Sequence, residues 1–151
     1  MINKEIRSRL THMTIVAEKA LSKSQAGISG CKNACALLAK NKEGEYAVFD
    51  GCNIELSTST VIHAERLALF GAISKGFTMP IAIVMAIKDD KVAPSCGYIA
   101  PMCGYCRQDY MYVNPNLKVY TLEENHKLHG YTLKDTLIKP YMSKGKIDHG
   151  N

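Results

Sequence analysis

The chain has 151 residues and a mass of 16.7 kDa, which is the usual size of one domain. Hydrophobic residues make up 46% of it and charged residues 22%, which excludes disordered and low-complexity proteins. The longest strictly apolar run, 81–87, is far shorter than the roughly 20 residues of a membrane-spanning helix, so we expect no membrane partner.

The first half of the chain predicts a helix, a β-hairpin and a second helix. Residues 3–22 form the first helix, because their apolar side chains recur on one helical face. Two apolar runs, 33–39 and 46–54, flank an Asn-Lys-Glu-Gly turn signal and predict the hairpin. A polar segment able to cap a helix precedes the second helix, 61–75, which ends at a glycine.

The second half predicts alternating strands and helices. Residues 80–87 are continuously apolar and rich in β-branched side chains, which is typical of a central strand buried on both faces. A long loop, 89–102, leads to a short helix over 103–113. Residues 117–122 predict another buried strand, and 131–141 a final short helix.

This order of elements predicts an α/β fold of three layers, with a mixed sheet between helices on both faces. We expect one domain over residues 1–151, including the N-terminal helix within 1–22 and a solvated tail over 142–151. The N-terminal residues carry charges without the apolar run of a secretory signal, which favours a cytoplasmic protein. The net charge of +5 permits anionic partners without requiring one, so nucleic acid is not the expected partner.

Six cysteines are the most informative feature of the composition. Inside a cell, cysteines serve more often as metal ligands, nucleophiles or small packed residues than as disulfides. We expect three of them to be packed residues: Cys31, Cys35 and Cys52. The other three are Cys96, Cys103 and Cys106.

Two short motifs together predict a metal site. His63-Ala64-Glu65 lies near the start of one expected helix, and Cys103-Gly104-Tyr105-Cys106 at the start of another. One imidazole and two thiolates supply three ligands for tetrahedral Zn²⁺ and leave a position for water, which is the pattern of catalytic zinc. Positive helix N-termini favour the thiolates. Glu65 is not needed as a ligand and is well placed to transfer protons beside that water.

These motifs match the zinc deaminase signature H-x-E…C-x-x-C, and the chain resembles the zinc-dependent cytidine deaminases, especially the short enzymes acting on free nucleosides. The likeness runs over about 36–141 and includes the strings Gly51-Cys52-Asn53-Ile54-Glu55, His63-Ala64-Glu65-Arg66 and Cys103-Gly104-Tyr105-Cys106-Arg107-Gln108. It implies the cytidine deaminase-like three-layer fold, a homotetramer or dimer, and deamination of cytidine or deoxycytidine in pyrimidine salvage.

The resemblance also implies a role for each matching residue. His63, Cys103 and Cys106 would hold zinc, and Glu65 would move protons between water, the ring N3 and the leaving amine. The substrate would be bound by Asn53 and Glu55 at the ribose hydroxyls, and by the backbone of Ala64 at the pyrimidine.

The chain departs from the family pattern at three points. Met102 separates the usual proline from the first cysteine, and His63 stands where short cytidine deaminases generally have cysteine. The aromatic that normally lies against the base is missing, with Gly30 at its expected position. Another ring would have to replace it, the candidates being Phe70, Tyr98 and Tyr105.

Several alternatives follow from these departures. The substrate can be another small cytosine-containing compound, such as a blasticidin-like aminonucleoside or a modified cytosine. A nucleotide or polynucleotide deaminase and a non-catalytic zinc protein are further possibilities. Cys96 is an alternative metal ligand to Cys103, and His126 with His129 forms an H-x-x-H pair that is either a second metal site or a solvated loop.

Overall fold

The computed structural model describes residues 4–89, 102–122 and 126–136. Its elements, in chain order, are α1 (Lys4–Leu21), β1 (Cys31–Lys40), β2 (Tyr46–Cys52), β3 (Ile54–Ser57), β4 (Thr60–Ile62), α2 (Ala64–Ser74), β5 (Met79–Asp89), α3 (Gly104–Val113), β6 (Lys118–Leu122), β7 (Leu128–Thr132) and the short 3-10 helix η2 (Leu133–Asp135).

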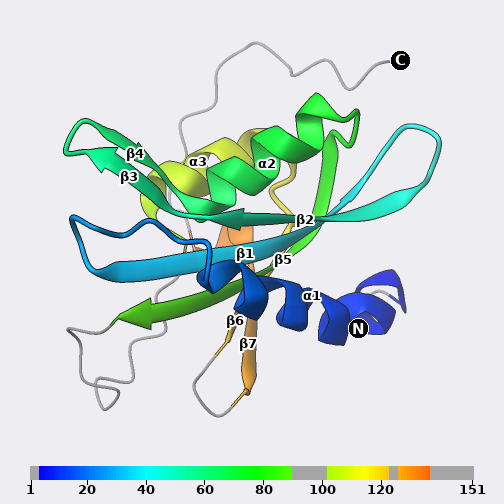
Figure 1. The fold of residues 1–151 in the computed structure, drawn as a ribbon. Helices are drawn as coiled ribbons and strands as arrows, with labels where there is room; N and C mark the ends of the chain where they lie inside the picture. Colours follow the sequence, from blue (N-terminus) through cyan, green and yellow to red (C-terminus); the bar gives the residue numbers. More distant parts are fainter. Residues whose placement is uncertain (1–3, 90–101, 123–125, 137–151) are drawn as a thin grey trace.

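A five-stranded mixed sheet forms the middle of the molecule, in the order β2-β1-β5-β6-β7 (Figure 1). The β1–β2 hairpin and the β1–β5 and β6–β7 pairs are antiparallel, whereas β5 and β6 are parallel. A parallel pair needs a crossover connection, and α3 lies in the chain between β5 and β6. The β3–β4 pair forms a separate small sheet.

Alternating side chains of the central strands pack against helices on both faces. In β1, Cys35, Leu37 and Ala39 join a core cluster with α2 and α3. Ala36 and Leu38 of the same strand join another cluster with α1 on the opposite face. Because successive side chains of a strand point to opposite faces, β1 and β5 serve both clusters. The predicted three-layer α-β-α fold is confirmed, and Figure 1 shows α1 on one side of the sheet and α2 and α3 on the other.

The structure corrects two predicted boundaries. The second helix begins at Ala64, not at residue 61, because the β-branched run Thr60–Ile62 pairs with β3 as a strand. The final helix predicted over 131–141 is wrong over its described part: Leu128–Thr132 is strand β7, antiparallel to β6, and only the single turn η2 follows it. Tyr131 lies opposite Val119 in this pairing, so cross-strand packing outweighs the weak helical pattern.

The other elements agree with the sequence analysis. The structure contains the remaining predicted elements, with boundaries within a few residues of those expected: the first helix (α1), the hairpin (β1 and β2), the central strand (β5), the short helix (α3) and the strand that follows it (β6). Most of the predicted 89–102 loop and all of the predicted 142–151 tail lie outside the described residues. None of the described helices combines the length and the apolar character needed to cross a membrane.

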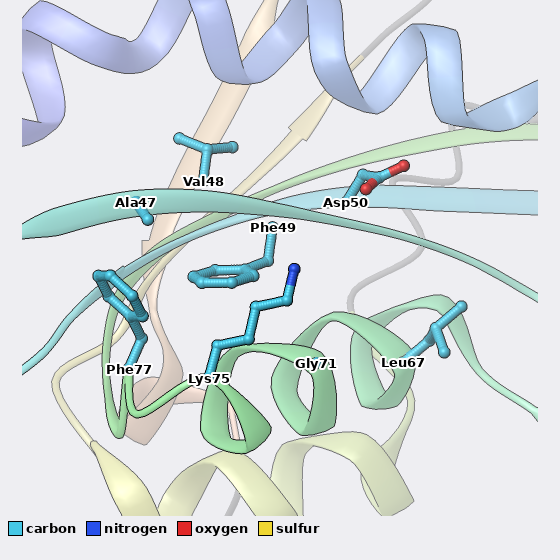
Figure 2. Close-up of a pocket in the computed structure, with 8 residues that line it drawn as sticks. All are labelled: Ala47, Val48, Phe49, Asp50, Leu67, Gly71, Lys75 and Phe77. Carbon is cyan, nitrogen blue, oxygen red and sulfur yellow. The ribbon is translucent and has the colours of Figure 1, made fainter.

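Gly51 lets α2 approach the sheet closely. A Cβ at this position would lie 2.1 Å from the carbonyl oxygen of Ala64, in the first turn of α2. Further along the same interface, a groove of about 490 Å³ opens between β2 and α2 (Figure 2). Phe49 and Phe77 meet there with ring centroids 5.2 Å apart. Charged Asp50 and Lys75 also line the groove, which contains none of the predicted site residues.

Candidate active site

The two sequence motifs lie at the N-termini of neighbouring helices on one face of the sheet. His63 is the residue immediately before α2 and has extended backbone dihedral angles (φ −76°, ψ 147°). Cys103 stands immediately before α3 in a similar conformation, and its sulfur accepts a hydrogen bond from the backbone N–H of Cys106. Both helices pack into the same core cluster, which brings residues 40 positions apart in the sequence together.

The structure brings His63, Cys103 and Cys106 into one group that can hold a metal ion. Their ligand atoms all lie within 4.8 Å of one another. The Nδ1 atom of His63 is 3.3 Å from the sulfur of Cys103 and 3.5 Å from that of Cys106. Tetrahedral zinc, with bonds of about 2.05 Å to nitrogen and about 2.3 Å to sulfur, separates these atoms by about 3.6 Å. The donor set and its spacing therefore fit zinc.

The predicted group contains no fourth protein ligand among the residues that the structure describes. Cys96, the alternative ligand, lies outside the described residues. His126 and His129 do not belong to any metal-binding group of three in the described part of the chain. The imidazole of His126 instead lies 2.9 Å from a carboxylate oxygen of Glu18 in α1.

The two thiols of this group have different pKa values. The Cys106 thiol donates toward Cys103, and this is the largest cause that lowers the pKa of Cys103 to about 5. The same shared proton raises the pKa of Cys106, and burial raises it further. A cation that binds both sulfurs would displace the shared proton.

Glu65 lies at the bottom of the site in the first turn of α2. Only 4% of its surface is exposed, and burial raises the pKa of its carboxyl. Its backbone carbonyl accepts a hydrogen bond of 2.8 Å from the hydroxyl of Tyr110, which is fully buried in α3. This bond ties the turn that carries Glu65 to the helix that carries Cys106.

A pocket of about 250 Å³ connects the metal-binding group with the other predicted residues. All of the predicted site residues line it except Cys106, which is buried behind the pocket wall. Sequence analysis missed the remaining lining residues, which come from β1, β4 and β5: Cys31, Asn33, Val61, Met85 and Ile87. These positions were not found because neither a motif nor a spacing links them to the helix starts.

Cys31 differs from the other two cysteines that were expected to be packed. Cys35 and Cys52 are buried, as predicted, whereas Cys31 is half-exposed and lines the pocket. Its neighbour Gly30, which stands at the position expected for the missing aromatic, is not among the residues that line the pocket.

Of the aromatic residues that could replace the missing ring, the two that the structure describes do not line the pocket. Phe70 and Tyr105 are 50% and 64% exposed on the outer surfaces of α2 and α3. Tyr105 lies under the guanidinium of Arg66 at 3.8 Å, and this guanidinium also pairs with Asp109. Tyr98 lies outside the described residues.

Asn53 is a buried junction beside the pocket. Its Oδ1 accepts hydrogen bonds from the hydroxyl of Ser24 and from the backbone N–H of Asn33. Its Nδ2 donates to the carbonyl of Cys31 at 3.0 Å and, at 3.4 Å, to a carboxylate oxygen of Glu55. The amide thus joins the start of β1 to the segment that carries Glu55.

Glu55 is held by the chain between α1 and β1. Its Oε2 accepts from the backbone N–H groups of Ile28 and Ser29, each at 2.9 Å. Its Oε1 accepts from the hydroxyl of Ser29 at 2.6 Å. These donors lower the pKa of the Glu55 carboxyl, and the Ser29 hydroxyl has the largest effect.

Two further positions were missed because they act through contacts distant in sequence. Tyr131 in β7 accepts a hydrogen bond of 3.3 Å from the backbone N–H of Met102, next to Cys103. Ser29 contacts Glu55 across 26 residues. Neither carries a local sequence signal.

The fold is shared with solved structures of cytidine deaminases. The enzyme from Burkholderia pseudomallei is 28% identical, with a TM-score of 0.69 over 87% of this chain and 98% of that one. A cytidine deaminase from Mycobacterium tuberculosis is 19% identical, with a TM-score of 0.65 over 89% of this chain and 98% of that one. One from Bacillus anthracis is 13% identical, with a TM-score of 0.59 over 87% of both chains. Comparisons with protein-family models and with curated protein sequences give no match.

Proposed function

We propose that this chain, which has the architecture of a cytidine deaminase-like family, is a zinc-dependent enzyme that hydrolyses the 4-amino group of cytidine or deoxycytidine. The products would be the corresponding uridine nucleoside and ammonia. The observation that supports this most directly is that His63, Cys103 and Cys106 form one metal-binding group, and that His63, Cys103 and the buried carboxyl residue Glu65 line one pocket.

Zinc fits the donor set better than the hard cations do. Thiolate and imidazole ligands favour zinc, whereas magnesium and calcium prefer oxygen ligands. When bound, zinc lowers the pKa of a coordinated water and so supplies a nucleophile near neutral pH. His63, Cys103 and Cys106 would hold it.

Glu65 would transfer the protons. It lines the pocket beside His63 without belonging to the metal-binding group, so its carboxylate is available to the substrate. Burial raises the pKa of this carboxyl toward neutrality, and an acid–base group works best when its pKa lies near the working pH. Its carboxylate would take a proton from the attacking water and give it to the ring N3. It would then take the second proton from the new hydroxyl at C4 and give it to the departing amine, which leaves as ammonia.

Two further lining residues would bind the sugar. Asn53 and Glu55 would contact ribose hydroxyls, since a carboxylate is a strong acceptor for a hydroxyl donor. The backbone of Ala64, between His63 and Glu65, would hold the edge of the pyrimidine. Six of the seven predicted site residues thus line one pocket.

One observation favours a second candidate substrate. No aromatic ring lines the pocket among the described residues, and Cys31 and Asn33 present a small thiol and an amide instead. Such a lining suits another small cytosine-containing compound, such as a modified cytosine. The ratio kcat/KM across a panel of cytosine nucleosides and modified cytosines separates the two candidates, because the physiological substrate class should give the highest value.

The decisive experiment compares the wild type with Glu65→Gln. We expect one zinc per chain in both proteins, because Glu65 is not a ligand. Ammonia release from cytidine should fall by a factor of about 10²–10⁴ in the variant, the usual contribution of general acid–base catalysis. Cys106→Ala is the complementary control and should lose the metal as well as the activity. Equal ammonia release by wild type and Glu65→Gln would refute the proton-transfer role, and a wild type that deaminates no cytosine compound would refute the function.

The single catalytic domain, the homo-oligomer, the cytoplasmic location and the role in pyrimidine salvage stay predictions. Size-exclusion chromatography with light scattering tests the oligomer: a tetramer is expected, and a monomer would contradict it.

A further inference from the structure

The segment between α1 and β1 is fastened to the strand that carries Glu55. The backbone N–H of Gln25 donates to the carbonyl of Asn53 at 3.0 Å, and the N–H of Glu55 donates to the carbonyl of Gln25 at 2.9 Å. This parallel bridge fixes the beginning of the segment. The residues that follow, 26–30, bring Ile28 and Ser29 beside the Glu55 carboxylate.

Ser29 makes most of the short hydrogen bonds to that carboxylate. A carboxylate has about four acceptor positions. Ser29 fills two of them, one from its backbone N–H at 2.9 Å and one from its hydroxyl at 2.6 Å. Ile28 fills a third from its backbone N–H at 2.9 Å. Both oxygens of Glu55 are thereby fixed in one orientation.

The fourth acceptor position is the weakly occupied one. The Nδ2 of Asn53 approaches Oε1 of Glu55 only to 3.4 Å, which is long for such a bond. A substrate hydroxyl that donates to Oε1 would replace this weak contact without breaking the three short ones. The Ser29 hydroxyl also accepts a bond of 3.0 Å from the backbone N–H of Cys31, which lines the pocket.

From this geometry we propose that Ser29 is a positioning residue for substrate binding: it orients the Glu55 carboxylate so that Oε1 receives a sugar hydroxyl of the nucleoside. The inference rests on the proposed function, and it adds a residue that has no counterpart in the motifs of the sequence. Ser29 acts through Glu55 and need not touch the substrate itself.

The physical reason is preorganisation. Glu55 lines the pocket and is only half-buried, so an unrestrained carboxylate there would sample several rotamers in water. Holding it in place before the substrate arrives removes an entropy cost from binding. In agreement with this, the Ser29 hydroxyl is the largest of the causes that lower the pKa of Glu55, so it keeps the carboxylate in its charged, accepting form.

The experiment uses Ser29→Ala, Ser29→Thr and the control Ser22→Ala, each as the full-length, zinc-loaded chain. Ser22 is an exposed serine whose hydroxyl donates to the carbonyl of Lys19 in α1 and makes no contact with Glu55 among the described residues. We expect Ser29→Ala to raise KM for cytidine roughly three- to tenfold, the effect of losing about one hydrogen bond, with kcat nearly unchanged. Ser29→Thr keeps the hydroxyl and should restore most of the loss, and Ser22→Ala should behave as wild type.

A substrate without the 2′- and 3′-hydroxyls of the sugar separates positioning from general loosening of the fold. With 2′,3′-dideoxycytidine, Ser29→Ala and wild type should give the same KM, because Glu55 then has no 2′- or 3′-hydroxyl from which to accept. An equal rise in KM for both substrates, or no rise for cytidine, would overturn the role of Ser29 while the deaminase function stands.

Binding of uridine, measured by calorimetry, tests Ser29 independently of turnover. Tighter binding of uridine by the wild type than by Ser29→Ala would support the positioning role. This holds even if no cytosine compound is deaminated, because that result would contradict only the proposed function. Equal uridine binding by the two proteins, or no binding by either, counts against Ser29.

Discussion

Replacing Asn53 with alanine tests whether one amide holds this part of the pocket together. The side chain is buried, and the variant would remove three hydrogen bonds that join separate parts of the chain. Its Oδ1 accepts two of them, from the Ser24 hydroxyl and from the backbone N–H of Asn33 at 2.9 Å. Its Nδ2 donates the third to the carbonyl of Cys31 at 3.0 Å.

The expected magnitude follows from this count. A buried hydrogen bond contributes about 1 kcal/mol net, so three give a loss of about 3 kcal/mol in the free energy of unfolding. Alanine offers no replacement partner, and the three groups left behind are buried or half-buried, which places the loss at the upper end for each bond. Asn41→Ala is the matched control, because Asn41 bonds to Glu45 in the exposed turn of the hairpin. It should cost about 1 kcal/mol or less.

Urea unfolding followed by circular dichroism measures both losses, provided that the slope against urea is the same for all three proteins. The two variants should differ by about 2 kcal/mol. A loss for Asn53→Ala no greater than that for Asn41→Ala would refute the argument that this amide is a structural junction.

Two further predictions concern the β2–α2 contact and acid. Gly51→Ala should destabilise the fold by about 1–3 kcal/mol, because its Cβ would lie 2.1 Å from the backbone oxygen of Ala64 and α2 would have to move. Gly71→Ala in α2 is the control: its Cβ would meet nothing within 4 Å, so the change should be neutral or stabilising by up to about 1 kcal/mol. If thermal unfolding showed that both variants lower the melting temperature equally, this account of the packing at Gly51 would be refuted. The lowered pKa of Glu55 means that its carboxylate stabilises the fold fully above its ordinary pKa of 4.5, and that this contribution is lost as the pH falls through the lower value of the folded state. The stability difference between wild type and Ser29→Ala should therefore shrink as the pH falls below 4.5, and a difference that stays constant in acid would refute the link between Ser29 and Glu55.

The metal-binding group was predictable from the sequence because each half of it is local. A histidine before one helix and a Cys-x-x-Cys at the start of another are recognisable from spacing alone, and Glu65 is fixed by its place two residues after His63. The three-layer fold was predictable for a similar reason, since the apolar periods of 3–22 and 80–87 match a helix and a buried strand.

The elements that prediction missed depend on contacts between distant segments. Thr60–Ile62 is a strand because β3 lies beside it, and Leu128–Thr132 is a strand because β6 offers an edge. In both cases the local pattern was too short to decide between helix and strand, and the pairing partner decided it.

The sequence by itself determined the chemistry: which side chains can bind a metal, which carboxylate lies beside them, and which segments bury apolar faces. Only the tertiary structure decided the surroundings of that chemistry: that Cys31 and Asn33 line the pocket, that Tyr110 holds the turn of Glu65, and that Ser29 orients Glu55. The physical reason is that ligand identity is a property of single residues at short spacing, whereas hydrogen bonds across 20 to 45 positions exist only once the chain has packed.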